Sequence, residues 1–206
     1  MILLASAVEA ELGFWQPRRG VETLAMGIGP VEAASALAAA LARREYSLVV
    51  NVGLAGAFDG AARLGDGVVV IEDVMELDLE TGAPISLPPG ETIVAKATSD
   101  PELAEQLHVK GFALLRGVTV ARVTSSEATA KRLAHDLDAQ VESMEGFAAL
   151  RAAQRAGVRA IELRGISNRC GERGLSDWSF TAGVAGLQRV LTALFELPAL
   201  QRVRSQ

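Results

Sequence analysis

The sequence has few cysteine and histidine residues, and these shortages exclude several kinds of site. One of its 206 residues is cysteine, Cys170, so the chain cannot form an internal disulfide. Its two histidines, His108 and His135, lie in polar surroundings without the spacing of metal ligands. We expect both to face solvent rather than to bind metal or act as a base. The chemistry must therefore rest on carboxylates and amides, with no metal and no cofactor.

Dense runs of positive charge and long apolar runs are missing as well. The formal net charge is −5 and no Lys/Arg cluster occurs, so the footprint of a nucleic-acid partner is absent. No uncharged apolar stretch reaches the roughly 18 to 20 residues that a membrane span needs. The first residues, MILLASAVEAE, have no basic segment of the kind that begins a secretory signal. These features predict a soluble, cytoplasmic protein with no membrane or nucleic-acid partner.

Two glycine motifs are incomplete. In Gly27-Ile-Gly29-Pro-Val-Glu32, a glutamate stands where a dinucleotide fingerprint has its third glycine, and no P-loop lysine follows. NAD and ATP are therefore not supported. In Gly165-Ile-Ser167-Asn-Arg169, the closing glycine of a nucleophile elbow is missing, so Ser167 is a poor candidate for a serine-hydrolase nucleophile.

Apolar runs alternate with helical patterns over a length that suits one domain, residues 1–206. This alternation predicts an α/β fold with a largely parallel sheet covered on both faces. The expected strands are residues 1–8, 23–28, 48–52, 67–71, 114–121 and 160–166. The expected helices are residues 31–44, 126–135 (after a capping box at residues 124–127), 144–156 and 180–195.

Two segments have the composition of irregular chain. Residues 80–100 contain Pro84, Pro88, Pro89 and Gly90, and apolar strand patterns lie on both sides of them. We expect a loop excursion here rather than a linker between domains. The polar residues 201–206 have nothing to bury, and we expect them to fray.

Three polar positions follow the ends of expected strands, where open α/β sheets gather ligands. Glu9 and Glu11 follow the first strand, although carboxylates also favour the first turn of a helix, and position alone leaves both readings open. Glu145 follows a short strand and begins a helix, two residues after Ser143, a spacing that does not make a capping box. Asn168 follows the strand at residues 160–166, where a role as a turn residue is the alternative.

Five short motifs also follow one another along most of the chain. They are Ala7-Val-Glu-Ala-Glu11, Gly27-Ile-Gly-Pro-Val31, Asn51-Val-Gly-Leu-Ala-Gly56, Glu142-Ser-Met-Glu145 and Arg164-Gly-Ile-Ser-Asn168. In this order they resemble the nucleoside phosphorylase/nucleosidase superfamily. The versions Gly53-Leu-Ala-Gly-Ala-Phe58, Val123-Thr-Ser-Ser-Glu-Ala128 and Glu142-Ser-Met-Glu-Gly146 are most similar to the futalosine hydrolase family. One departure is Gly165, which stands where alanine is commoner.

The resemblance implies a fold and a reaction. The implied fold is a three-layer α/β/α sandwich with a mixed, partly barrel-like central sheet, assembled as a homo-oligomer of two or more copies. The implied partner is a small purine nucleoside, whose N-glycosidic bond is hydrolysed. Futalosine is the expected substrate, giving hypoxanthine and dehypoxanthine futalosine in menaquinone biosynthesis.

The resemblance also implies roles for individual residues. Glu11 matches the carboxylate that activates water, and Glu145, with Met144 packed beside it, matches the ribose site. Asn168 matches a position that is Asp in adenine-cleaving nucleosidases. Because an amide can donate to the oxygen of a 6-oxopurine, this exchange favours hypoxanthine as the base and gives Asn168 both a catalytic and a binding role.

Further substrate contacts are expected from Gly56 and from the backbone near Val123 and Thr124. For Thr124, the role of a helix cap competes with that of a binding residue. Futalosine carries a carboxyphenyl group, and Arg169 or Arg173 is expected to supply a cation for its carboxylate. The alternative is that these arginines belong to a solvated basic loop.

Hydrolysis is favoured over phosphorolysis because the segment Asn51–Gly56 contains no arginine and carries an apolar Leu54 where phosphorylases hold phosphate. The alternative is that Arg18 and Arg19 bind phosphate after a loop rearrangement. Two other functions stay open. One is that of another superfamily enzyme, a methylthioadenosine/adenosylhomocysteine nucleosidase or a purine nucleoside phosphorylase. The other is that of a protein that binds a nucleoside without cleaving it.

Overall fold

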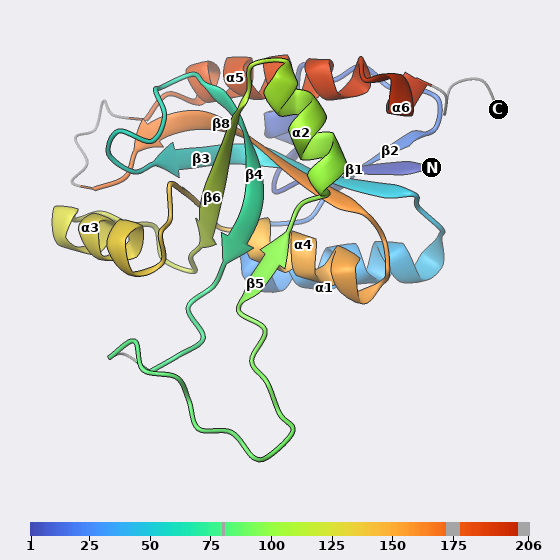
Figure 1. Cartoon of the computed structure of the whole chain (residues 1–206). Coiled ribbons are helices and arrows are strands. Elements are labelled where there is room, and N and C mark those ends of the chain that lie inside the picture. The colour runs from blue at the N-terminus through green and yellow to red at the C-terminus, as the bar shows by residue number, and fades with distance from the viewer. Residues whose placement is uncertain (80, 172–177, 202–206) are drawn as a thin grey trace.

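The computed structural model describes residues 1–79, 81–171 and 178–201, which form one mixed eight-stranded sheet with helices on both sides (Figure 1). The strands are β1 (Ile2–Ser6), β2 (Val21–Ala25), β3 (Leu48–Ala57), β4 (Gly67–Val74), β5 (Lys96–Thr98), β6 (Ala113–Thr119), β7 (Val141–Ser143) and β8 (Ala160–Arg169). The helices are the 3-10 helix η1 (Glu9–Leu12), α1 (Pro30–Arg43), α2 (Pro101–Val109), α3 (Glu127–Asp136), α4 (Gly146–Arg155), α5 (Phe180–Phe195) and α6 (Pro198–Gln201).

Part of the sheet closes into a barrel. β8 pairs in parallel with β3 and antiparallel with β4, while β4, β6 and β7 lead back to β3. β1 and β2 extend the sheet beyond β3, and β5 extends it beyond β4. The mixed, partly barrel-like sheet is therefore confirmed, and the antiparallel pairs qualify the expectation of a largely parallel one.

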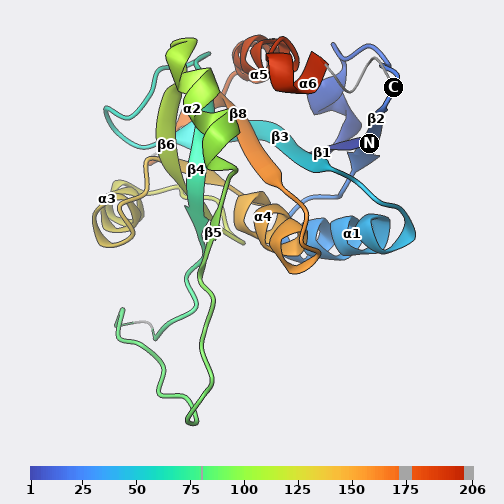
Figure 2. The same cartoon turned by 45° about the vertical axis from the view of Figure 1, so that its right-hand side comes forward.

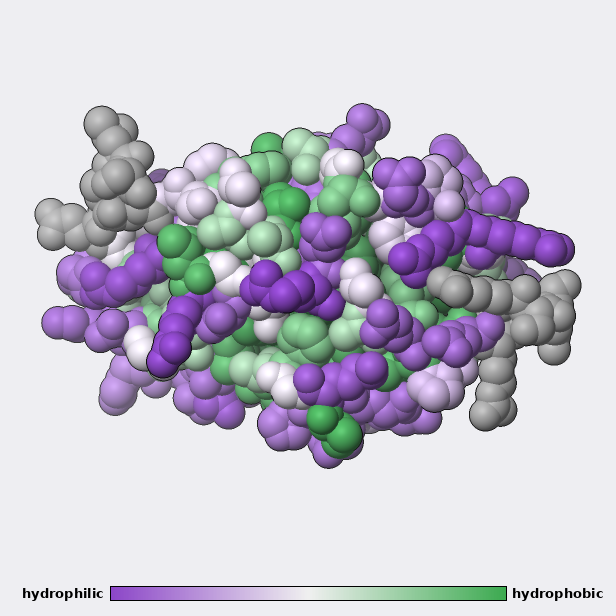
Figure 3. Space-filling view, turned by 90° about the horizontal axis from the view of Figure 1, so that it is seen from above, coloured by the Kyte–Doolittle hydropathy of each residue, from purple (hydrophilic) through white to green (hydrophobic). Residues whose placement is uncertain are grey.

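Helices cover the two faces of the sheet in separate layers. Figures 1 and 2 show α5 and α2 on one side and α1 and α4 on the other. The apolar residues of α5 pack with β1, β3 and β8, whereas those of α1 and α4 form a second cluster on the opposite face. Viewed over α5 and α2, hydrophilic side chains lie spread between hydrophobic ones (Figure 3).

Glycines let α5 lie directly on the strands. A methyl group on Gly165 of β8 would collide with the carbonyl oxygen of Gly183, and one on Gly186 would collide with the carbonyl oxygen of Gly65. Backbone therefore packs against backbone at this contact, which alanine at position 165 would push apart. This contact gives a physical reason for the unusual glycine at position 165.

The expected helices are present, but the expected cap of α3 was wrong. Ser126 precedes the helix, and its hydroxyl accepts a hydrogen bond from Thr129 N at 3.2 Å. Thr124 is buried outside the helix and donates instead to the carboxylate of Glu142. Thr124 stands at a position that fits a capping sequence, but in the folded chain its hydrogen-bond partner is Glu142, which is distant in sequence.

Two strands run further than the sequence predicted. β3 continues through its glycines to Ala57, and β8 continues through Asn168 to Arg169. Small and polar residues usually end strands, but here the two strands pair with each other as far as Ala57 and Arg169 and close the barrel. Asn168 is therefore a strand residue, and its reading as a turn residue was wrong.

The excursion between β4 and β5 is largely irregular and projects away from the sheet (Figure 1). The sequence predicted that this loop extends to residue 100, which was wrong. Lys96–Thr98 form β5, and α2 begins shortly afterwards with Asp100 as its cap. Gln201 was expected to fray but ends α6, and residues 202–206 lie outside the described part of the chain. None of the helices in the described ranges is long and apolar enough to cross a bilayer.

Candidate active site

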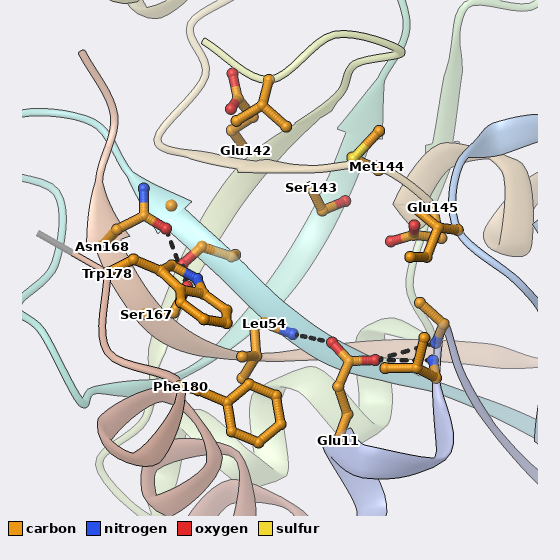
Figure 4. Close-up of a pocket in the computed structure, with 16 residues that line it drawn as sticks. Glu11, Leu54, Glu142, Ser143, Met144, Glu145, Ser167, Asn168, Trp178 and Phe180 are labelled. Carbon is orange, nitrogen blue, oxygen red and sulfur yellow. Dashed lines mark hydrogen bonds between the residues drawn. The ribbon is translucent and has the colours of Figure 1, made fainter. Parts of the chain in front are cut away.

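A cavity of about 350 Å³ opens between η1, the ends of β3, β7 and β8, and the start of α5 (Figure 4). Its volume is within the range of small-molecule pockets. The polar groups on its wall come from segments far apart in the sequence. The lining residues are Ala7, Val8, Glu11, Ile28, Leu54, Ala55, Gly56, Val123, Glu142, Ser143, Met144, Glu145, Ser167, Asn168, Trp178 and Phe180.

Glu11 points into this cavity from η1 and is held by backbone donors. Its Oε1 accepts a hydrogen bond from Leu54 N at 2.9 Å, and its Oε2 accepts one from Ala7 N at 3.1 Å. The side chain is only 7% exposed. Burial raises the pKa of Glu11, while the Leu54 N–H and the positive charge of Arg164 oppose that rise. The result is a fixed carboxylate that holds a proton more readily than one in water.

Glu145 lies across the cavity at the start of α4. Its side chain makes no hydrogen bond to the helix it precedes, and Oε1 accepts one from Gly29 N at 2.8 Å. Gly29, which caps α1, has a φ of 95°, a conformation that favours glycine, and its N–H donates to Glu145 at the start of α4. Glu145 is 5% exposed and leaves acceptor positions that face the cavity beside Met144.

Asn168 has an amide whose orientation is set by its neighbours. Its Oδ1 accepts a hydrogen bond from Ser167 Oγ at 3.0 Å, and its Nδ2 donates to the carbonyl oxygen of Arg169 at 3.0 Å. One N–H of the amide is left for a ligand. A side chain on Gly56 would meet Nδ2 at 2.8 Å, so the glycine makes room for this amide.

A group of buried polar residues, the inner group, lies between the sheet and the start of α4. It consists of Asn51, Asp73, Glu162 and Arg164. Arg164 donates from Nε to Glu162 Oε1 at 2.8 Å, and a methyl group on Gly53 would touch both its Nη1 and Glu11 Oε1. Arg164 therefore connects the inner group to Glu11.

The two acids of the inner group face each other. A methyl group on Gly146 would collide with both Asp73 Oδ2 and Glu162 Oε1. Burial and the charge of Glu162 raise the pKa of Asp73 well above its ordinary value, with Thr119 and Arg164 opposing. Burial also raises the pKa of Glu162, although Arg164 counters it. Because only Glu162 has a cation within hydrogen-bond distance, we assign the proton of this pair to Asp73.

The cavity brings together nearly all of the residues predicted from sequence. Glu11, Gly56, Val123, Met144, Glu145 and Asn168 all line it. Thr124 does not line the cavity and instead hydrogen-bonds to Glu142, which does. Glu9 is exposed and faces a different cleft, on the other side of η1.

Several lining residues were missed by sequence reasoning. Glu142 and Ser143 belong to a motif whose role was assigned wholly to Met144 and Glu145. Trp178 and Phe180 form an aromatic wall at the start of α5, with ring centroids 5.8 Å apart. A signal for this wall existed, because two of the chain's few aromatic residues lie two positions apart at the start of an expected helix.

The described lining residues include no arginine, lysine or histidine. Arg18 lies over the rings of Trp15 and Phe195, at 4.7 and 5.2 Å from their centroids. Arg169 points away to Glu127, with contacts of 2.9 and 3.0 Å, and Arg173 lies outside the described residues. Both histidines are exposed, as expected, and the described residues contain no metal-binding cluster.

Solved structures that resemble this fold include nucleosidases. The crystal structure of a 5′-methylthioadenosine/S-adenosylhomocysteine nucleosidase from Colwellia psychrerythraea, in complex with adenine, superposes with a TM-score of 0.78. It shares 19% identity over 94% of this chain and 93% of that one. The corresponding nucleosidase from Helicobacter pylori gives a TM-score of 0.80 at 15% identity, covering 95% and 97% of the two chains. These likenesses confirm the fold.

Sequence comparison gives the family. Residues 18–197 match the Phosphorylase superfamily. The futalosine hydrolase of Thermus thermophilus is 37% identical over 85% of this chain and 81% of its own length. That of Acidothermus cellulolyticus is 39% identical over 84% and 74% of the two chains. The chain therefore belongs to the phosphorylase superfamily and, within it, to the family of the futalosine hydrolases.

Proposed function

We propose that this protein is an N-glycosyl hydrolase that releases hypoxanthine from futalosine, a step of menaquinone biosynthesis. The observation that carries the proposal is the meeting of Glu11, Glu145 and Asn168 in one cavity of a chain related to futalosine hydrolases. In the reaction, water attacks C1′ of the ribose and the bond to the purine nitrogen breaks. The electron pair of that bond leaves with the base, which takes up a proton.

Glu11 is the general base of the proposed reaction. Its carboxylate removes a proton from the attacking water, and its negative charge stabilises the cation-like sugar as the glycosidic bond breaks. Burial raises its pKa, which strengthens it as a base near neutral pH. The backbone donors Leu54 and Ala7 hold it in place, so little reorganisation is needed during the reaction.

Glu145 and Met144 bind the ribose. A carboxylate only accepts hydrogen bonds, which suits the paired hydroxyls of the sugar. The bond from Gly29 fixes one of its oxygens and aims the carboxylate across the cavity toward Glu11. Met144 lies beside it as an apolar surface for the sugar.

Asn168 assists departure of the base. The remaining N–H of its amide donates to an acceptor on the purine edge and stabilises negative charge that develops on the leaving base. Ser167 and the Arg169 carbonyl favour the orientation with nitrogen toward the base. Gly56 and Val123 complete this end of the cavity, and Thr124 contributes through Glu142.

Water rather than phosphate is the proposed nucleophile. Three carboxylates, Glu11, Glu142 and Glu145, line the cavity, and their charge opposes an anion. Arg18, a possible clamp, is held against Trp15 and Phe195. We further propose that the enzyme works in the cytoplasm as a homo-oligomer, in line with its sequence features and its family resemblance.

The test is base release measured by chromatography. Purified enzyme is offered futalosine, inosine and methylthioadenosine, each with and without phosphate. We expect hypoxanthine from futalosine without phosphate. Adenine from methylthioadenosine, or turnover only with phosphate, would assign the chain to one of the other superfamily activities, and binding without turnover would make it a nucleoside-binding protein.

A further inference from the structure

Glu142 is a buried acid on the cavity wall that the proposed reaction does not use. It is 4% exposed and stands in β7. Within the described ranges, no arginine, lysine or histidine forms an ion pair with it. Its hydrogen bonds come from Thr124, whose N donates to Oε1 at 3.0 Å and whose hydroxyl donates to Oε2. Burying an acid with only the neutral donors that the described residues supply is costly, which points to a donor on a ligand.

Thr124 and Glu142 together change the hydrogen-bonding character of this wall. Without Glu142, the Thr124 N–H would be a free donor next to the cavity. Because the carboxylate occupies that N–H and still has unused acceptor positions, the wall presents an acceptor instead. A ligand edge at this point must therefore carry a hydrogen-bond donor.

Glu142 and Asn168 lie at the same end of the cavity. Both pair with Gly56, Glu142 from β7 on one side and Asn168 from β8 on the other. Figure 4 shows both away from Glu11, which lies at the opposite side of the cavity. The absence of a side chain at Gly56 makes room for the Asn168 amide and for Cys170 Sγ, either of which a methyl group there would strike. One end of the cavity therefore offers a donor from Asn168 and an acceptor from Glu142.

The edge of a 6-oxopurine has the complementary pattern. Its O6 and N7 accept hydrogen bonds and its N1–H donates one, whereas adenine has an acceptor at N1 and donors on its amino group. We propose that Glu142 accepts the N1–H of the purine and, together with Asn168, selects a 6-oxopurine over a 6-aminopurine. The inference rests on the proposed function and deepens it by assigning the recognition of the base.

This arrangement rejects adenine by leaving buried groups unpaired. The lone pair of adenine N1 would face the carboxylate, with no hydrogen between them. Sites that bind a polar edge discriminate strongly against the mismatched one for this reason. Thr124 acts as a positioning residue, because its two donors fix the carboxylate.

The experiment measures binding of free bases by isothermal titration calorimetry to the full chain. The probes are hypoxanthine, 1-methylhypoxanthine, in which a methyl group replaces the N1 hydrogen, and adenine. The variants are Glu142→Gln and, as a matched acid-to-amide control, Glu102→Gln on the exposed surface of α2. We expect wild type and control to prefer hypoxanthine over both other bases by about 10-fold or more.

Glu142→Gln should lose that preference, because its amide nitrogen can donate to N1 of adenine. Equal binding of hypoxanthine and 1-methylhypoxanthine by wild type, no binding of hypoxanthine at all, or a full preference kept by Glu142→Gln would each overturn the inference. Equal binding of hypoxanthine and 1-methylhypoxanthine by wild type would overturn the inference even if the variant does not fold.

Failure of the inference is distinguishable from failure of the proposed function. If wild type hydrolyses futalosine but ignores the N1 methyl group, the function stands and the role of Glu142 does not. If it discriminates the bases through Glu142 but releases no hypoxanthine from futalosine, base recognition stands and the hydrolytic function does not.

Discussion

Two neighbouring groups of buried polar side chains differ in how fully their hydrogen bonds are satisfied. The cavity group, Glu11, Glu142, Glu145 and Asn168, is held mainly by backbone N–H groups and hydroxyls. The inner group contains all five buried side-chain atoms that lack a hydrogen-bond partner among the described residues. They are Asn51 Nδ2 and Oδ1, Asp73 Oδ2, Glu162 Oε2 and Arg164 Nη2.

The two groups of buried polar side chains therefore have different expected roles. Neutral backbone donors fix the cavity group in position but leave acceptor capacity for a ligand. The inner group holds charges close together with incomplete pairing, which costs stability. Changes in the cavity group should therefore act on turnover, and changes in the inner group on stability. Three variants test this division, in order of decreasing effect.

Glu11→Gln should have the largest effect. It keeps an oxygen for Leu54 N but removes the base, so we expect kcat to fall by about 10³-fold while hypoxanthine binding is kept. In wild type, the raised pKa of Glu11 places the acid limb of the kcat/KM profile above the ordinary value of 4.5. Steady-state kinetics from pH 4.5 to 8 would measure the fall in kcat of the variant and the acid limb of the wild-type profile. Unchanged turnover in Glu11→Gln would contradict the role of Glu11 as the base.

Asn168→Asp should have the second largest effect on turnover. It removes the N–H that faces the purine and sets a carboxylate oxygen against the Arg169 carbonyl. We expect kcat/KM for futalosine to fall by about 100-fold, with little change in the free energy of unfolding. Ser167→Ala is the milder companion, because it removes only the group that orients the amide. If Asn168→Asp retained full activity on futalosine, its donor role would be excluded.

Asp73→Asn should have the smallest effect, on stability. Above pH 3.8 the unfolded Asp73 is ionised, whereas the folded one keeps its proton, so wild type loses stability as pH rises toward the folded pKa. The variant has no such proton, and its advantage should grow by up to about 1.4 kcal/mol per pH unit.

Urea unfolding at several pH values would measure this advantage, with the exposed Asp78→Asn as the control. A difference that does not vary with pH would place the proton of the pair elsewhere. A large loss of turnover in Asp73→Asn would break the division between the two groups.

Much of this arrangement could be predicted from sequence, and the exceptions have physical reasons. Regular periodicity located α1, α4 and α5 within one or two residues, and motifs located Glu11, Glu145 and Asn168. The inner group was not predicted, although Asn51 and Arg164 begin two of the motifs, because Glu162 and Arg164 lie inside an apolar run and Asp73 follows another. Sequence cannot tell a polar strand residue that points into a barrel from one that points to solvent.

Glu142 and Thr124 were misread for a related reason. Their hydrogen bonds join residues 18 positions apart, and a local capping pattern gave Thr124 a sufficient explanation of its own. The strand β5 is three residues long, too short for a periodic signal, whereas the equally short β7 was expected as the short strand before Glu145.

The glycines beneath α5 have a consequence for how this enzyme could change its substrate range. Phe180, the first residue of that helix, forms part of the cavity wall, while the depth at which the helix sits is set by Gly165 and Gly183 further along. The aperture of the site is thus encoded by atoms that never meet a substrate. A single carbon added at position 165 would push α5 away from the strands, leaving the reacting groups unaltered in sequence.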